Sequence, residues 1–523
     1  MDVMVYQTQV WLNETYGNHP GYNRIVEDGI TGWSTMYALT RALQIELGIT
    51  ETADNFGPTT LRLLGQLGPI SRTSNTNENI VKIIQGGLYC KGYGPGGITG
   101  YFGPGTEAAV ASMQANMGLE NADGVVTPKV FKALLTMDAY VLLSGGRPLI
   151  RSIQQWLNNK YHHRENFFFI PCDGLYSRNT QKALVYAIQY EEGLSDEIAN
   201  GHFGPTTQSL LPTIYVGNSD GSTFFVHLFQ AAMIFNNYDV PFDGEFTSEV
   251  SRRVQEFQEF CALPQTGIGD FQTWASLLVS TGDPNRKGTA CDCITEITPA
   301  RALTLKNEGY ETVGRYLTNA DGEGSLNKKI QPGELSTIFD AGLTVFPIYQ
   351  TYGNRASYFN LGQGRIDAEA AYHAAINYGF KHDTTIYFAV DFDALGYEIT
   401  NNIIPYFKGI NQTMSNLGNR YNIGVYGPRS VCIQVSDEGF ASTSFVSGMS
   451  TGFSGNLGYP LPANWAFDQI STRAIGSGEG YIEIDNNIKS GRDNGSSSVV
   501  DDTNLNEDAF NQLENISVLA MFY

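Results

Sequence analysis

The stretch TTIYFAVDFDALG, from Thr384 to Gly396, places two carboxylates directly after an apolar run. Asp391 and Asp393 are separated by one residue, and residues i and i+2 of an extended strand share a face, about 6.6 Å apart. The two side chains can therefore enter one pocket together. Crowding separates the pKa values of neighbouring carboxyls, so that one keeps its proton while the other stays charged. General acid catalysis beside a negative group requires that division of roles.

Further polar residues follow other apolar runs in the second half of the chain. Hydrolysis of a glycoside needs a protonated carboxyl for the leaving oxygen and a negative group for the oxocarbenium-like transition state. We expect Asp391, Asp393 and two further carboxylates, Asp292 and Asp485, to be catalytic. The residues expected to bind substrate are Arg315, Tyr349, Gln350, Tyr426 and Gln469.

The elements that must position these residues alternate between β-branched runs and helical segments. Strands are predicted near Ala290, Thr312, Leu343, Thr385, Asn422, Phe445, Trp465 and Tyr481. The helical segments between the early strands start near 299, 332, 365 and 402. This alternation predicts a parallel sheet covered by helices, most simply a compact, incomplete or modified (β/α)8 TIM-like barrel over 288–490, in which the carboxyl ends of the strands carry the chemistry.

The first half of the chain repeats itself in the order A-B-A-B. DGITGWSTMYALTRALQ from Asp28 aligns with DGLYSRNTQKALVYAIQ from Asp173, and GYFGPGTEAAVASMQ from Gly100 aligns with GEFTSEVSRRVQEFQ from Gly244. Each unit has a helix carrying x-Q-x-x-L, a D-G-x-x-G/S-x-x-T turn, and a second amphipathic helix. We expect four three-helix repeats, at 1–70, 76–142, 146–215 and 221–282.

Two features of these repeats have two interpretations each. The D-G-x-x-T turn is either a helix-capping device or a direct contact for a ligand. Aromatic residues in the inserts of the A units either stack on sugar rings or pack against the neighbouring repeat. These aromatic residues are Tyr16, Tyr22, Tyr161 and Phe167 to Phe169.

The repeats resemble the peptidoglycan-binding domain type 1, a three-helix module found beside bacterial cell-wall hydrolases. The resemblance covers about 1–282 and is clearest in DGLYSRNTQKALVYAIQYEEGL and in FDGEFTSEVSRRVQEFQEFCALPQTGIGDFQTWASL. It implies that these units hold the chain on bacterial peptidoglycan.

The barrel segments ACDCITEITPARALTLKNEGYETVGRYLTN, YFAVDFDA, NIGVYG and WAFDQIST…YIEIDNN resemble the glycoside-hydrolase-like domain-of-unknown-function family 1906, itself similar to the family-25 lysozymes. By that resemblance Asp393 takes the place of the general acid, which is a glutamate in family 25, and Asp391 takes the place of the first carboxylate of the same D-x-E motif. We hypothesise that Asp391 orients the 2-acetamido group of the substrate and that Asp292 and Asp485 shape the charge around it. Gln469 falls in the place of the W-Q-Y stretch.

Charge and composition exclude several functions. The formal charge of −21 argues against nucleic acid, because a binder needs a basic footprint. No apolar run is long enough to span a membrane, and the N-terminal stretch MDVMVYQTQVWLNETYG lacks the features of a secretory signal. The six cysteines form no zinc spacing, so we expect reduced thiols, no metal and no cofactor. GMSTG, 448–452, matches a nucleophile elbow but lacks the helix that must follow it.

The sequence therefore predicts a modular peptidoglycan hydrolase, an N-acetylmuramidase of endolysin type that reaches the wall after lysis or non-classical export. The alternative is a non-catalytic wall-binding or carbohydrate-binding protein with an inactive barrel, such as a phage-tail or injection-system component. Residues 491–523 read as an acidic linker with a short apolar tail, which either docks on a phage or injection-apparatus partner or folds back on the barrel.

Overall fold

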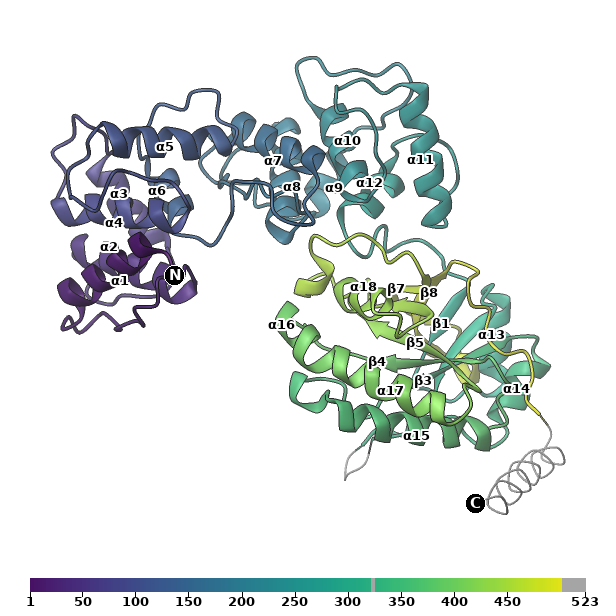
Figure 1. The fold of residues 1–523 in the computed structure, drawn as a ribbon. Coiled ribbons are helices and arrows are strands. Elements are labelled where there is room, and N and C mark those ends of the chain that lie inside the picture. Colours follow the sequence, from purple (N-terminus) through teal and green to yellow (C-terminus); the bar gives the residue numbers. More distant parts are fainter. Residues whose placement is uncertain (321–324, 501–523) are drawn as a thin grey trace. The chain divides into compact units, whose positions relative to one another are not determined.

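The computed structural model describes residues 1–320 and 325–500, and the chain divides into two compact units, Met1–His202 and Phe203–Tyr523. The first unit is built from helices, and the second combines helices with a closed barrel (Figure 1). The protein is therefore multidomain, as predicted. Within the described ranges, no helix has the length and apolar character needed to cross a membrane.

The repeats contain three helices each. In the first unit these are α1 Val3–Tyr16, α2 Trp33–Glu46, α3 Pro58–Leu67, α4 Glu78–Cys90, α5 Pro104–Asn116, α6 Pro128–Leu134, α7 Pro148–Tyr161 and α8 Arg178–Glu191. In the second unit they are α9 Pro205–Leu210, α10 Phe225–Phe235, α11 Ser248–Phe260 and α12 Phe271–Leu278. Proline at the first helical position starts α3, α5, α6, α7 and α9, because its missing N–H has no partner there in any case.

A buried glutamine holds the turn that follows the first helix of every repeat. In the third repeat, Gln154 accepts from the N–H of Gly174 at 2.9 Å and donates to Asp173 and Thr180. The glycine has φ 79°, in the left-handed region that favours glycine. The equivalent pairs are Gly29 with Gln9, Gly100 with Gln85, and Gly244 with Gln230. The polar groups of the turn are thus used inside the repeat, which supports the capping interpretation.

The aromatic residues in the inserts of the A units also contribute to the hydrophobic core. Tyr16, Tyr22 and Tyr161 are buried, and so are Phe167 and Phe169. The Tyr16 hydroxyl donates to Glu46 at 2.7 Å, and Tyr161 donates to Glu191 at 2.8 Å. The rings of Tyr16 and Tyr161 therefore pack within their own repeats, whereas Phe169 of the third repeat joins the core of the first two and so packs against a neighbouring repeat.

Eight strands close into a barrel in sequence order. They are β1 Ala290–Asp292, β2 Thr312–Tyr316, β3 Thr344–Tyr349, β4 Thr385–Ala389, β5 Asn422–Gly427, β6 Thr443–Val446, β7 Trp465–Ile475 and β8 Ile482–Lys489. The main helices outside it are α13 Pro299–Asn307, α14 Glu334–Asp340, α15 Leu361–Asn377, α17 Ile404–Asn416 and α18 Arg429–Asp437, of which α15 and α17 lie side by side (Figure 1). Each strand starts within a few residues of its predicted position.

The barrel is not parallel throughout. β8 runs antiparallel to both β7 and β1, and β7 and β8 form a hairpin. The predicted barrel is therefore confirmed in a modified form, since its sheet is parallel from β1 to β7 and antiparallel at β8. Because β8 runs in the opposite direction, its first half lies beside the end of β1, and Asp485 pairs with Asp292 in the register.

Alternation along the strands separates an inner from an outer core. The interior is filled by Ala290, Phe346, Ile348, Tyr387, Phe445, Ala466 and Phe467. Phe346 and Phe467 stack there with ring centroids 4.1 Å apart. Cys291 and Cys293 lie in the outer core beneath the helices, on the opposite face from Asp292, as the strand alternation predicts. All six cysteines are free thiols.

Within the second unit, the fourth repeat packs directly on the barrel. Trp465 of β7 donates to the Phe260 carbonyl at 3.0 Å, and Ser280 donates to the Gly448 carbonyl at 2.7 Å. After the last strand, Ser496 pairs with Val345 of β3. Residues 491–500 therefore lie along the barrel. The expected apolar tail lies outside the described residues.

Candidate active site

A cavity of about 250 Å³ opens where β1, β2, β5, β7 and β8 present polar side chains. It is lined by Asp292, Tyr316, Ile348, Gln350, Ala389, Asp391, Tyr426, Phe445, Met449, Ser450, Gln469 and Asp485. Three of the four expected catalytic carboxylates, and three of the five expected substrate-binding residues, are in this lining. The structure thus brings together residues that lie almost 200 positions apart in the chain.

The side-chain amide of Gln469 joins two of the carboxylates. Its Nε2 donates to Asp292 Oδ1 at 3.0 Å and to Asp485 Oδ2 at 3.3 Å, while Tyr426 donates to its Oε1 at 2.9 Å. Because an ionised carboxylate only accepts hydrogen bonds, the amide nitrogen of Gln469 faces the two aspartates, and its oxygen is left to accept from the tyrosine hydroxyl. The two aspartates are therefore held side by side over the end of β1.

Burial raises the pKa values of both carboxyl groups in this pair. Asp292 is 3% exposed and accepts a second bond, from Asn487 Nδ2 at 3.0 Å. Burial and the neighbouring charge of Asp485 raise the pKa of Asp292 to about 7, although the two amide donors oppose the shift. Burial also raises the pKa of Asp485, against the hydrogen bond from Thr472 at 2.6 Å. The pair therefore holds a proton close to neutral pH.

Asp391 has a different environment. It is exposed, and the side-chain amide of Gln350 links its carboxylate to the ammonium group of Lys328. Gln350 Nε2 donates to Asp391 Oδ2 at 3.1 Å, and Lys328 Nζ donates to Gln350 Oε1 at 2.8 Å. The ammonium of Lys328 lies 4.3 Å from the centroid of the Tyr316 ring, which lines the cavity. Burial lowers the pKa of Lys328 to about 8, and Asp391 opposes that shift.

Asp393 does not line the cavity. It is exposed and accepts from the backbone N–H of Ser454 at 2.5 Å and from its hydroxyl at 3.2 Å. β4 ends at Ala389, so the alternation that would point Asp391 and Asp393 the same way stops before it reaches them. The expectation that both enter one pocket is wrong. Asp393 instead anchors the loop after β6, which contributes Met449 and Ser450 to the lining.

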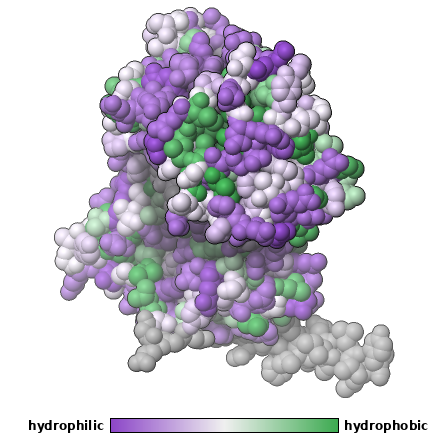
Figure 2. Space-filling view, turned by 90° about the vertical axis from the view of Figure 1, so that its left-hand side faces the viewer, coloured by the Kyte–Doolittle hydropathy of each residue, from purple (hydrophilic) through white to green (hydrophobic). Residues whose placement is uncertain are grey.

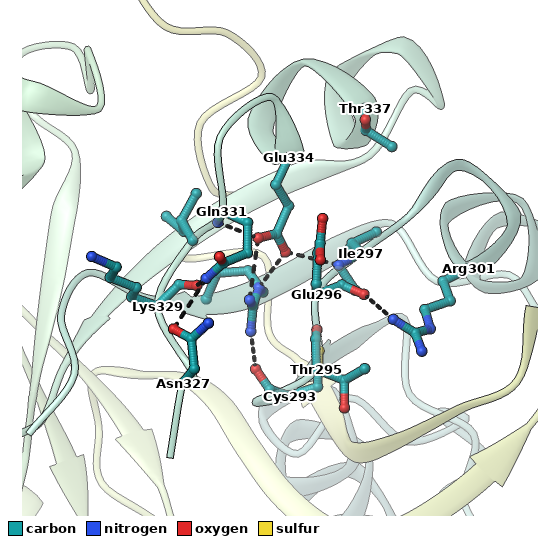
Figure 3. Close-up of polar contacts among 12 residues, drawn as sticks. Cys293, Thr295, Glu296, Ile297, Arg301, Asn327, Lys329, Gln331, Glu334 and Thr337 are labelled. Carbon is teal, nitrogen blue, oxygen red and sulfur yellow. Dashed lines mark hydrogen bonds and ion pairs between the residues drawn. The ribbon is translucent and has the colours of Figure 1, made fainter. Parts of the chain in front are cut away.

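Arg315 lies behind the cavity and not in it. Its side chain is fully buried, and its guanidinium pairs with Glu334, with Nε 2.7 Å from Oε1. Glu334 also accepts from the N–H groups of Ile297 at 2.9 Å and Gln331 at 2.7 Å, and Arg315 donates to the Cys293 carbonyl (Figure 3). This ion pair joins the loop after β1 to the loop that carries Lys328. The prediction that Arg315 contacts substrate is wrong.

Tyr349 also faces away from the cavity. It is buried in the outer core, and its hydroxyl donates to Asp367 of α15 at 3.4 Å. Along β3, Ile348 faces the cavity, so its neighbour Tyr349 must point to the helices. The expectation that Tyr349 binds substrate is wrong for this reason.

Sequence reasoning missed several residues of the site. Lys328 contacts both Gln350 and the ring of Tyr316, while Asn487 and Thr472 donate to the carboxylate pair. Asn487 could have been noticed, because it follows Asp485 at the i+2 position of a predicted strand. Ser450 of the GMSTG motif lines the cavity, but no histidine is among the described lining residues. No cluster of three or more His, Cys, Asp or Glu in the described ranges is arranged to hold a metal ion.

Family models match three regions of the chain. An "Rv2525c-like, glycoside hydrolase-like domain" matches residues 303–489, a "FadG/YbfG, PGDB-like domain" matches 143–278, and a "putative peptidoglycan binding domain" matches 77–134. The chain therefore carries a glycoside hydrolase-like barrel together with a domain of the peptidoglycan-binding type.

Solved structures with some similarity to this chain include the Tat-secreted protein Rv2525c of Mycobacterium tuberculosis in complex with HEPES. It is 22% identical, with a TM-score of 0.34, over 40% of this chain and 99% of that chain. A B. stearothermophilus protein is 16% identical, with a TM-score of 0.29, over 39% of this chain and 96% of that one.

Two full-length relatives come from Bacillus subtilis (strain 168). The uncharacterized protein YbfG is 52% identical over 512 residues, which are 95% of this chain and 69% of that protein. The uncharacterized protein FadG is 66% identical over 515 residues, which are 98% of this chain and 89% of that protein. Identity at this level over nearly the whole chain shows that the chain belongs to the FadG/YbfG family.

Proposed function

We propose that the barrel hydrolyses the glycan of bacterial peptidoglycan, at the β-1,4 bond between muramic acid and glucosamine, while the helical repeats hold the polymer. One observation carries the proposal: three carboxylates share one cavity, and burial raises the pKa of two of them, that of Asp292 to about 7. A glycosidase needs this combination of a protonated and a charged carboxyl.

In this mechanism the Asp292–Asp485 pair supplies the proton. Asp485 is the more accessible of the two, so it faces the glycosidic oxygen and gives it its own proton, while Gln469 holds the buried Asp292 beside it. Asp391 is the charged group that stabilises the oxocarbenium-like transition state. Lys328, acting through Gln350, fixes the position of that carboxylate.

These roles depart from those carried over from the lysozymes, in which the position of Asp393 supplies the acid. An exposed carboxylate that accepts two bonds from Ser454 is held as an anchor for the loop. The same observation favours a second candidate function. If the acid position of the lysozymes has been lost without replacement, the barrel binds glycan and does not cleave it.

Incubation of the purified chain with peptidoglycan, followed by mass spectrometry of the products, separates the two functions. The proposal predicts new reducing ends on muramic acid, their loss in Asp391→Asn and Asp485→Asn, and their retention in the matched control Asp393→Asn. Retention of the protein on the wall without new reducing ends refutes hydrolysis and leaves the binding function. The chain is proposed to act at the cell wall, reached by lysis or by non-classical export.

A further inference from the structure

One position in the repeats presents a large apolar side chain to solvent. It directly follows the turn glycine, and its occupants in the first three repeats are Ile30, Tyr101 and Leu175, with exposed fractions of 61%, 67% and 37%. The fourth repeat, which packs on the barrel, has Glu245 there. Single exposed apolar residues are common on protein surfaces, but their recurrence at one structural position is a property of the repeat.

The backbone at this position is fixed by the glutamine that holds the turn. The carbonyls of Ile30, Tyr101 and Leu175 accept from the Nε2 atoms of Gln9, Gln85 and Gln154 at 3.2, 3.0 and 2.9 Å. Since the same bond is made in each repeat, the side chain leaves the backbone at the same point of the turn. A ligand that binds there has no loop to order, which removes part of the entropic cost of binding.

The first repeat enlarges this surface. Trp33 is 56% exposed and stacks on Tyr37 with ring centroids 5.5 Å apart. The fold does not require an aromatic residue at this position, because the residues equivalent to Trp33 in the other repeats are Pro104, Arg178 and Ser248. Figure 2 shows hydrophobic side chains gathered among hydrophilic ones on the face that the N-terminal repeats present.

We propose that Ile30, Tyr101 and Leu175, with Trp33 beside the first of them, contact the apolar faces of sugar rings in the peptidoglycan glycan strand. The choice of this polymer rests on the proposed function and on the match of residues 77–134, which include Tyr101, to a peptidoglycan-binding domain. Pyranose rings offer C–H faces that stack on aromatic and aliphatic side chains. Such contacts need no charge, which suits a chain of net charge −21 approaching an anionic wall.

Each contact alone is weak, and the repeats combine them. A repeating polymer engages several repeats of one chain, so each further contact forms at a high effective concentration. Removal of one side chain therefore weakens binding by the contribution of one contact, and removal of all of them abolishes the multivalent contact.

Co-sedimentation with purified insoluble peptidoglycan tests this, with the full chain carrying Asp391→Asn throughout so that binding is read without cleavage. Tyr101→Ser is expected to weaken binding about tenfold, and Ile30→Ser, Tyr101→Ser and Leu175→Ser together by at least about a hundredfold. Glu245→Ser, at the same position of the fourth repeat, is the matched control and is expected to bind unchanged. The exposed sites make all these variants foldable, which far-ultraviolet circular dichroism checks.

A second readout uses Trp33 itself. Soluble N-acetylglucosamine oligomers are expected to change the tryptophan fluorescence of the chain, and Trp33→Ser is expected to lose that change. Unaltered fluorescence in the chain with native Trp33, together with unchanged sedimentation of the triple variant, overturns the proposal. So does a triple variant that binds peptidoglycan normally but loses self-association in ultracentrifugation, because the surface then joins two copies of the chain.

The outcome is separable from that of the proposed function. Binding that depends on Tyr101, in a chain whose native barrel releases no reducing ends, supports the glycan surface and refutes hydrolysis. Cleavage of peptidoglycan by a chain that binds independently of Tyr101 supports hydrolysis and overturns the glycan surface.

Discussion

Replacing the buried Asp292 by asparagine tests the electrostatics of the site independently of any substrate. The pKa of this carboxyl rises from the ordinary 3.8 to about 7. At about 1.4 kcal/mol per pKa unit, the ionised form therefore costs the folded state on the order of 4 kcal/mol. The asparagine side chain would keep the shape and accept the same two amide bonds, but it carries no charge at any pH.

The direction in which stability changes with pH follows from the number of protons that each state binds. Between pH 4 and pH 7 the folded state holds a proton that the unfolded state has released, so the wild-type chain loses stability as the pH rises through this window. Asp292→Asn removes that loss. The variant is expected to gain unfolding free energy relative to wild type at pH 8.5, on the order of 4 kcal/mol, and much less at pH 5.

Calorimetric unfolding of both proteins at the two pH values measures this difference, and titrating groups other than Asp485, whose titration depends on Asp292, cancel in the comparison. Asp393→Asn, which removes an exposed carboxylate near the same loops, is the matched control and is expected to change stability equally at both pH values. A difference between Asp292→Asn and wild type that is the same at pH 5 and pH 8.5 would refute the raised pKa and the proton that the mechanism assigns to the pair.

Three further predictions concern activity and stability. Cleavage of peptidoglycan is expected to fall as the pH rises through about 7, since an ionised Asp292–Asp485 pair has no proton to donate; a rate that rises through this range contradicts the assignment. Arg315→Met is expected to lower the unfolding free energy by about 3–5 kcal/mol, because Glu334 is left buried and unpaired, and a loss below about 1 kcal/mol in chemical denaturation argues against that role. Gln154→Leu is expected to cost about 2–3 kcal/mol in the first unit, since it leaves buried turn groups without partners; unchanged thermal unfolding would show that the turn holds without it.

The strand order could be predicted because β-branched runs followed by helix signals mark a barrel in any sequence. The direction of β8 was not predicted, since an apolar run has no direction. The connection from 476 to 481 is too short for a crossover helix, and that is the signal that indicates a hairpin.

The candidate site was predictable where alternation continues and unpredictable where it stops. Asp292 lies within a strand, so its direction followed from the two buried cysteines beside it. Asp393 lies beyond the end of β4, where no periodicity applies. Lys328 reaches the site from a loop, through Gln350, and a contact between residues so far apart leaves no local pattern.

In the repeats, too, contacts between residues far apart in the chain could not be predicted from local sequence patterns. The glutamine of x-Q-x-x-L is visible in the sequence, but its role in holding the turn depends on three-dimensional contacts with Gly29, Gly100, Gly174 and Gly244. Whether the residue after each of these glycines is exposed depends on the same contacts, because they fix the backbone of the turn.

Release of reducing ends from peptidoglycan tests the central claim most directly. Wild type and Asp393→Asn are expected to produce new muramic acid reducing ends, and Asp391→Asn is expected to reduce the rate at least about a hundredfold. Equal rates for wild type and Asp391→Asn, with the loss falling on Asp393→Asn, would contradict the assignment of the cavity carboxylates.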